Sequence, residues 1–216
     1  MSAPIEQAIY RHRFSEAELE SNRLLWAPIC RYLQRYVNPD GVTLDLGAGY
    51  CHFINQIQSR EKIAVDINAD ALRRYAAPGV RCLASMDGIP PDSLHTVFAS
   101  NVYEHFPSQE AVAESFASIH RALKPGGQFL IMQPNFAHCA KRYFDFFDHR
   151  LIFTHRGMQE GLEIHGYRLA RVVDRFLPYT TKSALPKSAF LVDLYLRFPQ
   201  AWRFLGGQML LVAVRD

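Results

Sequence analysis

The feature that most constrains the fold is the stretch 42–50, which reads Val-Thr-Leu-Asp-Leu-Gly-Ala-Gly-Tyr. It predicts a short buried strand that ends in an acid, followed by a glycine turn that opens a helix. Gly47 and Gly49 let the backbone bend tightly, and they let a ligand approach atoms that a Cβ would shield. The stretch therefore predicts an α/β fold with a ligand site at the end of this strand.

A second carboxylate, Asp66, ends the next apolar run, about 20 residues after the glycine turn. A carboxylate at that place can accept two hydrogen bonds from a ribose diol. Gly-x-Gly alone is a weak signal, because many loops contain it by chance. Strand, acid, glycines, helix, strand and second acid in this order are much stronger, and they indicate a nucleoside-binding site.

The charges around the glycine turn indicate which nucleoside binds. The dinucleotide fingerprint needs a third glycine where this chain has His52, and Asp45 would repel a pyrophosphate at the helix N-terminus. The same acid can attract an ammonium group, directly or through water. S-adenosylmethionine offers an ammonium, a ribose and an adenine without a phosphate, so it is the favoured ligand. A nicotinamide-dependent oxidoreductase is the weaker alternative.

Beyond residue 42, short apolar runs alternate with helical stretches, the pattern of a parallel sheet flanked by helices. Helical spacing also marks residues 4–37, and a Lys-Pro-Gly-Gly turn is expected at 124–127. The predicted strands are 42–46, 62–66, 80–83, 96–99, 128–133, 167–173 and 208–214, and the predicted helices are 51–60, 69–76, 109–123 and 155–164. A length of 216 residues suits a single domain.

These residues resemble the class I S-adenosylmethionine-dependent methyltransferases, in particular their bacterial small-molecule branch. The likeness extends over residues 42–135, and it includes Ala-Ser-Met-Asp-Gly-Ile-Pro at 84–90, Ala-Ser-Asn-Val-Tyr-Glu-His-Phe at 99–106 and Leu-Lys-Pro-Gly-Gly at 123–127. The resemblance implies a Rossmann-like, seven-stranded, mostly parallel sheet with an antiparallel last strand and helices on both faces. It divides the single domain into leading helices (1–40), a cofactor-binding core (42–135), a substrate or lid region (136–206) and the last strand (207–216).

The resemblance also implies the residues that surround the cofactor. Those near its methionine part would be Asp45, Gly47, Ala48 and Gly49, with Ser100 and Asn101 beneath the substrate, whereas Asp66 would hold the ribose and Ile67, Ser85, Met86 and Asp87 would lie near the adenine. Two positions depart from the pattern of many relatives. Cys51 replaces a third glycine, and Ser85 replaces an acid that contacts the adenine.

Methyl transfer is an in-line displacement at a sulfonium, so the protein mainly aligns the acceptor with the methyl group. A hydroxyl acceptor is helped by a general base, and histidine changes its charge near neutral pH. His105 follows the fourth predicted strand, at the edge where open α/β sheets bind ligands, and is the candidate base. The alternative is that it only packs or caps a helix start. Glu104 is expected to be solvated or structural.

The acceptor is the least constrained part of the prediction. The aromatic and basic segment 135–155 follows the fifth predicted strand, where the family usually builds its substrate site, so it predicts either a lid or a packed connection. We expect O-methylation of a small molecule or saccharide. Lys182, Lys187 and Arg197 are either solvated or face an anionic acceptor such as a sugar phosphate, a lipid-linked glycan or RNA. An RNA methyltransferase and a non-catalytic subunit or regulator remain as alternatives.

The composition of the chain limits its expected partners, its expected metals and its expected cellular compartment. The formal net charge of +3 permits anionic partners without requiring them, and no RNA-binding appendage is recognisable. The four cysteines are scattered, which predicts reduced thiols in a cytoplasm, and no Cys or His spacing predicts a structural metal. No signal peptide or membrane-spanning stretch is expected. Segment 188–206 predicts an amphipathic helix that packs on the sheet or lies on a membrane surface.

Overall fold

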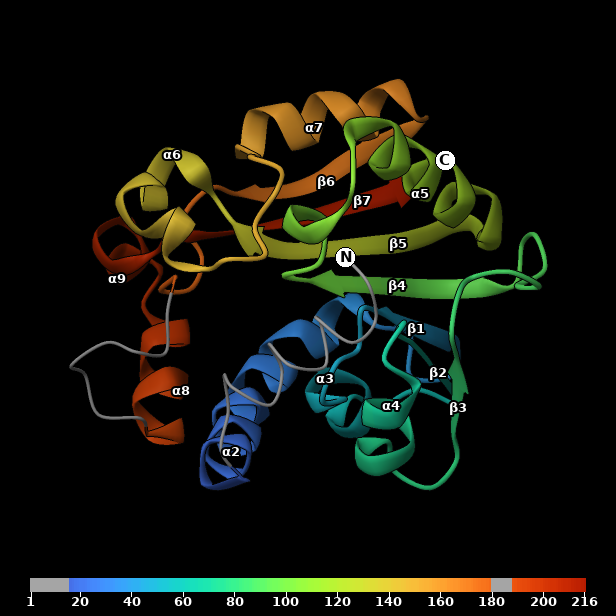
Figure 1. The fold of residues 1–216 in the computed structure, drawn as a ribbon, viewed down its shortest axis with the longest axis horizontal. Helices are drawn as coiled ribbons and strands as arrows, with labels where there is room; N and C mark the ends of the chain where they lie inside the picture. The colour runs from blue at the N-terminus through green and yellow to red at the C-terminus, as the bar shows by residue number, and fades with distance from the viewer. Residues whose placement is uncertain (1–15, 180–187) are drawn as a thin grey trace.

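A computed structural model describes residues 16–179 and 188–216. They form one seven-stranded sheet in the order β3-β2-β1-β4-β5-β7-β6 (Figure 1). The strands are β1 (Val42–Leu46), β2 (Glu61–Val65), β3 (Val80–Leu83), β4 (Leu94–Ser100), β5 (Leu123–Pro134), β6 (Tyr167–Val173) and β7 (Gln208–Arg215). β7 pairs antiparallel with both neighbours, whereas the other pairs are parallel. The predicted mostly parallel sheet with an antiparallel last strand is confirmed.

Helices cover both faces of this sheet, as predicted. Figure 1 shows α5 (Gln109–Ala122) and α7 (His155–Ile164) on one side, and α2 (Glu16–Leu33), α3 (His52–Gln56) and α4 (Ala69–Tyr75) on the other. Along β5, Phe129 and Ile131 face the first layer, whereas Leu130 and Met132 face the second. Both faces of the central strands are therefore buried, which is why these strands are apolar runs without a polar alternation.

Side-chain caps fix the starts of several helices. Ser108 accepts a hydrogen bond from Ala111 N at the start of α5, and Thr154 accepts one from Gly157 N at the start of α7. Such a cap satisfies a backbone donor that has no partner within the helix. The predicted helix start at Thr154 is confirmed.

Two predicted boundaries differ from the structure. The helix expected over 51–60 ends at Gln56, because the next residues are held extended: Gln58 N donates to Gln34 Oε1, and Ser59 Oγ donates to Gly41 O. The turn expected at 124–127 lies within β5. There the register against β4 shifts, and the extra residues, including Gly126 at φ +77°, form an irregularity of the strand.

The segment that follows β5 lies at the carboxyl edge of the sheet (Figure 1). It consists of α6 (Phe136–Cys139) and the 3₁₀ helix η3 (Ala140–Asp145). Buried Asn135 organises its start, since its side chain accepts from Ala137 N at 3.3 Å and donates to Asp174 O at 2.8 Å. This segment occupies the place predicted for the substrate region.

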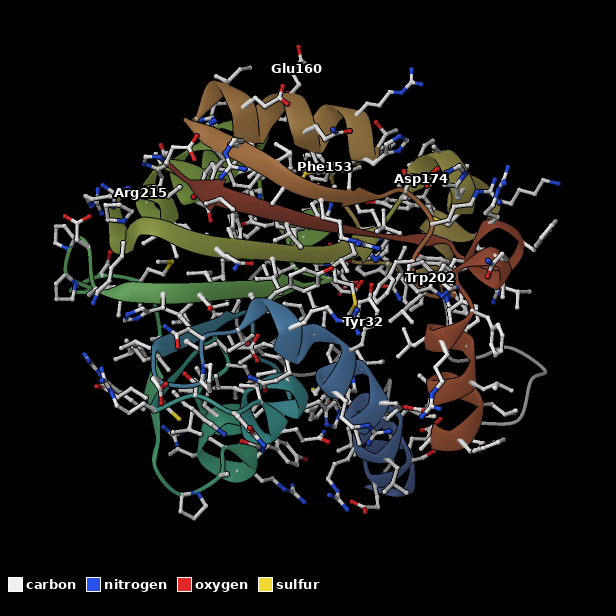
Figure 2. The ribbon with its side chains drawn as sticks, turned by 180° about the vertical axis from the view of Figure 1, so that it is seen from behind. Tyr32, Phe153, Glu160, Asp174, Trp202 and Arg215 are labelled. Atoms are coloured by element: carbon white, nitrogen blue, oxygen red, sulfur yellow. The ribbon has the colours of Figure 1, made fainter. Side chains whose placement is uncertain are left out.

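The amphipathic stretch near the C-terminus forms two helices, α8 (Ala189–Arg197) and α9 (Pro199–Leu205). The break falls at Phe198, because a residue before proline is disfavoured in the helical region. Trp202 packs against Tyr32 of α2 with ring centroids 5.8 Å apart (Figure 2), so the packed alternative holds for this face. Phe190 and Phe204 remain exposed. None of the described helices combines the length and apolar character that a bilayer crossing requires.

Candidate active site

The glycine turn after β1 is bonded to the end of β2. Gly47 N and Ala48 N both donate to Val65 O, at 2.8 and 3.1 Å, and Gly47 and Gly49 adopt φ of +68° and +49°. A Cβ placed on Gly47 would lie 1.9 Å from Cγ2 of Val102. The turn after β1 therefore packs directly against the loop after β4, with no room for a larger residue.

Asp66 connects the second predicted acid to the same turn. Its Oδ2 accepts a hydrogen bond from Gly49 N and its Oδ1 accepts one from Asn68 N, both at 2.8 Å. The side chain is buried, and this burial raises the pKa of the carboxyl, whereas the two backbone donors work in the opposite direction. The carboxylate is thus preorganised at the carboxyl end of β2.

Asp45 lies at the end of β1 and is also buried. Burial raises the pKa of its carboxyl well above the usual range, the backbone of Ile54 opposes this shift, and the charge of Asp66 adds to it. Two buried acids lie close to one glycine turn, and a nearby cation would offset the cost of burying their charge. Such a site suits a ligand that combines a cationic group with hydroxyl donors.

The residues predicted near the adenine follow β2 and β3. Asp66 N donates to Leu83 O, which joins the ends of these strands, and the Ile67 side chain is 69% exposed there. Ser85 Oγ donates to Asp87 Oδ2 at 2.8 Å. Met86 is partly buried against the core on the α5 side of the sheet. An exposed apolar side chain and a small polar pair therefore stand at this edge.

Ser100 and Asn101 end β4 beside the glycine turn. Asn101 has a φ of +51°, its backbone N donates to Met132 O, and its amide lies 3.4 Å from Ser100 Oγ. The next residue, Val102, makes the close approach to Gly47. The structure thus brings the predicted residues of β1, β2 and β4 together at one edge of the sheet.

The 3₁₀ helix η2 (Tyr103–His105) follows, and it contacts the segment after η3. His105 Nδ1 lies 3.1 Å from the carbonyl oxygen of Asp148 and 3.4 Å from its Oδ2. Glu104 is 1% exposed, so the expectation that it is solvated is wrong. Its backbone is structural, because Glu104 O accepts hydrogen bonds from the backbone N of Arg150 and of Leu151.

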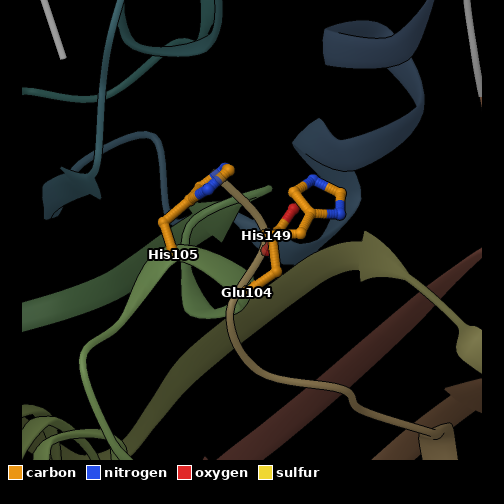
Figure 3. A group of neighbouring side chains, drawn as sticks. All are labelled: Glu104, His105 and His149. Carbon is orange, nitrogen blue, oxygen red and sulfur yellow. The ribbon is translucent and has the colours of Figure 1, made fainter. Parts of the chain in front are cut away.

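The neighbourhood of His105 contains groups that the sequence did not single out. The His149 ring lies 5.1 Å from the His105 ring (Figure 3). The same ring stacks on Phe146, and its centroid lies 4.7 Å from that of Tyr143. Asp148 and His149 fall within the aromatic segment 135–155, but their spacing gave no signal of a contact with Glu104 or His105. The segment is a packed connection with an aromatic side.

A separate cavity of about 430 Å³ lies between α2, α3 and α4. It is lined by Arg23, Tyr50, His52 and Arg74 among others, and by none of the predicted cofactor residues.

The basic residues predicted to be solvated or to face an anionic acceptor lie near the C-terminus. Arg197 pairs with Asp193 at 2.7 Å on α8, whereas Lys182 and Lys187 lie outside the described residues. The four cysteines are free thiols.

A family model described as a methyltransferase domain matches residues 44–131. The matched range begins in β1 and ends in β5, so it contains both acids, the glycine turn and His105. No curated protein sequence matches the chain.

Solved structures share the fold. An S-adenosylmethionine-dependent methyltransferase from Archaeoglobus fulgidus has a TM-score of 0.63 at 17% identity, covering 87% of this chain and 93% of its own. One from Mesorhizobium loti has a TM-score of 0.64 at 16% identity, covering 88% and 98%. A geranyl diphosphate methyltransferase in complex with S-adenosylmethionine has a TM-score of 0.62 at 15% identity, and the match covers 88% of this chain and 85% of that protein. Residues 44–131 thus match a methyltransferase domain family, and the chain shares its fold with S-adenosylmethionine-dependent methyltransferases.

The family match does not extend over the whole candidate site. It stops at residue 131, before the segment that brings Asp148 and His149 to His105. The two acids, the glycine turn, Glu104 and His105 lie inside the matched range, whereas Asp148 and His149 lie outside it. The predicted fold is confirmed, and the family match supports a methyltransferase domain over residues 44–131.

Replacing Gly47 by alanine tests the close approach of the two loops. We expect Gly47→Ala to unfold at a markedly lower temperature, by about 5 °C or more, because the added Cβ collides with Val102. Gly79→Ala is the matched control, since Gly79 also has a positive φ but has open space around it. Equal losses in the two variants, measured by thermal denaturation, would show that only the backbone conformation matters.

The buried acid in β1 predicts a conflict between stability and binding. Because its pKa is raised, the folded state favours the protonated carboxyl, so stability falls as pH rises above the usual value of about 3.9. We expect Asp45→Asn to raise the melting temperature at pH 7.5 by about 2–4 °C and the difference to vanish near pH 4. Asp40→Asn, at an exposed turn, is the control. An unchanged or lower melting temperature at pH 7.5 would contradict this explanation.

Proposed function

We propose that the chain binds S-adenosylmethionine between the glycine turn and Asp66 and transfers its methyl group to a hydroxyl of a small molecule or saccharide. The observation that supports this most directly is the pair of buried acids, Asp45 and Asp66, with Asp66 bonded to Gly49 N. Such a pair suits a ligand with an ammonium, a ribose diol and no phosphate.

The cofactor contacts follow from this placement. Asp66 accepts hydrogen bonds from the ribose hydroxyls, and Asp45 attracts the ammonium group, directly or through water. Gly47, Ala48 and Gly49 allow the methionine part to approach the backbone, with Ser100 and Asn101 on its other side. The adenine packs against exposed Ile67, near Met86, and meets the Ser85–Asp87 pair at its polar edge.

Transfer requires the acceptor oxygen, the methyl carbon and the sulfur to lie in line. The oxygen loses its proton, its electron pair forms the new O–CH₃ bond, and the S–CH₃ pair stays on sulfur, which becomes a neutral thioether. His105 handles this proton, because it is three residues after Val102 and Asp148 orients its ring. Positioning by the fold supplies much of the rate enhancement.

The acceptor is proposed to bind between η2 and the segment 135–155. The aromatic side chains around His149 provide a surface on which a sugar ring or another flat molecule can pack. The ring of Phe147 is 86% exposed on this segment, and Phe144 is 61% exposed. These features favour a compact acceptor with an apolar face.

Calorimetric titration with S-adenosylmethionine and S-adenosylhomocysteine tests the cofactor site. We expect micromolar affinity in the wild type and at least a tenfold loss, about 1.4 kcal/mol, in Asp66→Ala, because the ribose loses its acceptor. Asp66→Asn keeps the shape and one acceptor oxygen, and Asp40→Asn is the exposed control. No binding by the folded wild type would refute the proposal.

Formation of S-adenosylhomocysteine in the presence of saccharides and small alcohols, phenols and amines tests the acceptor. We expect turnover with a hydroxyl compound, and a loss of kcat of about 100-fold in His105→Gln with cofactor affinity unchanged. A rate unaffected by His105→Gln would remove this residue from the mechanism. Cofactor binding without turnover of any hydroxyl acceptor would favour a non-catalytic subunit, and turnover of RNA alone would replace the acceptor class.

A further inference from the structure

Three groups with metal-ligating chemistry meet at the acceptor side of the site. Glu104 and His105 lie in η2, and His149 comes from the connection between η3 and α7 (Figure 3). One ligand atom from each side chain lies within 4.8 Å of the other two. The histidine spacings along the sequence do not predict this meeting, because it joins segments that are far apart in the chain.

We propose that Glu104, His105 and His149 bind one divalent first-row transition-metal cation, with Zn²⁺ as the best fit. Two imidazoles and one carboxylate are borderline ligands that suit such ions, whereas Mg²⁺ and Ca²⁺ prefer an all-oxygen set. Three protein ligands also leave a coordination position open, as in catalytic zinc sites.

The distances are compatible with a small closure around the ion. A tetrahedral zinc site with bonds of about 2.1 Å places its ligand atoms about 3.4 Å apart. Starting from separations within 4.8 Å, each pair must approach by at most about 1.4 Å. The His105 and His149 side chains are half-buried, and we expect rotation of these side chains to supply this movement.

The backbone holds the three groups together. Arg150 N and Leu151 N donate to Glu104 O at 2.8 and 3.2 Å, so the residues after His149 are bonded to the residue that supplies the carboxylate. The His149 ring is positioned by stacking on Phe146, with centroids 5.2 Å apart and planes at 21°. Fixed ligands lower the entropy lost when the ion binds.

Asp148 provides the outer contact that ligating histidines commonly have. Its carbonyl oxygen lies 3.1 Å and its carboxylate 3.4 Å from His105 Nδ1, which fixes the orientation of that ring. Both carboxyl groups are buried, Glu104 at 1% and Asp148 at 8% exposure, and buried carboxylates strongly favour a nearby cation. The charge of Glu104 also adds to the burial that raises the pKa of the Cys139 thiol to about 12.

The position of the proposed metal site suggests a role for the cation in the methyl transfer. Val102 packs against Gly47, so two of the three ligands, Glu104 and His105, follow directly after the loop that packs on the glycine turn. This role rests on the proposed function: the acceptor hydroxyl occupies the open position, and the cation stabilises the oxygen after its proton leaves to solvent. The bonds made and broken are those of the transfer above, and the ion is not consumed. His105 then acts through the cation in place of accepting the proton itself.

Cation binding is tested on the full chain without an affinity tag, after removal of metals with a chelator. Calorimetry with Zn²⁺, and elemental analysis after gel filtration, are expected to give one equivalent per chain with a Kd of about 10 µM or lower. Co²⁺ is expected to give the visible absorption of a four- or five-coordinate site. Binding of Mg²⁺ with no binding of Zn²⁺ or Co²⁺, or the absence of a stoichiometric site, would overturn the proposal.

Single substitutions assign the ligands. His149→Gln and Glu104→Gln are each expected to weaken Zn²⁺ binding at least about tenfold, whereas His120→Gln, in α5 near Gly166, is expected to have no effect. Glu104 is buried, so His149→Gln decides the question if Glu104→Gln does not fold. Unchanged affinity in a folded His149→Gln variant would refute this site.

The role in transfer has a separate readout. Chelation is expected to lower kcat at least about tenfold and to leave the affinity for S-adenosylhomocysteine unchanged, with recovery on adding Zn²⁺. Unchanged kcat after complete metal removal would refute the catalytic role. Because Zn²⁺ binding is measured without cofactor or acceptor, a failure of the proposed methyl transfer leaves the cation site standing, and a failure of the site leaves cofactor binding standing.

Discussion

The site depends on the bond between the Asp66 carboxylate and the backbone N–H of Gly49. It joins the end of β2 to the turn after β1, and the bonds from Gly47 N and Ala48 N to Val65 O reinforce the same junction. A parallel sheet alone would bring the two strand ends near each other without fixing the turn. Because this turn also packs on Val102, its conformation determines where the loop after β4 can lie.

A second set of backbone hydrogen bonds fixes the connection before α7 against the helix η2. The carbonyl oxygen of Glu104 accepts two backbone hydrogen bonds from the connection before α7, so a segment with little regular structure has a defined position above β4. The Tyr143 hydroxyl donates to Leu151 O and adds a side-chain bond to this connection. The fold thus supplies two fixed loops, the turn after β1 and the connection before α7, which contact the loop after β4 at Val102 and the helix η2 at Glu104, respectively.

The sequence predicted the features that are encoded locally. Asp45, the glycine turn and Asp66 could be identified because each lies at or directly after the end of a strand that an apolar run marks, and Thr154 could be identified as a cap from its position alone. The early end of α3 was missed because it depends on Gln34 and Gly41, which bond to residues 58 and 59 across the fold. The contact of His105 with Asp148 was missed because the two are 43 residues apart, and only tertiary packing brings them together.

In the proposed reaction, the buried carboxyl groups of Glu104 and Asp148 affect how the acceptor oxygen can become a nucleophile near His105. An acceptor hydroxyl that loses its proton beside Glu104 and Asp148 would develop negative charge next to carboxylates that are themselves buried, and like charges in a poorly solvated site oppose this strongly. A histidine that only removes the proton becomes a cation at some distance from the oxygen and offsets part of this repulsion. In the proposed site, a divalent ion between Glu104, His105 and His149 offsets the charge of these two carboxylates and contacts the oxygen directly. Glu104, whose burial disfavours a metal-free reaction, is then a ligand of the ion, and Asp148 supports the site through its contact with His105.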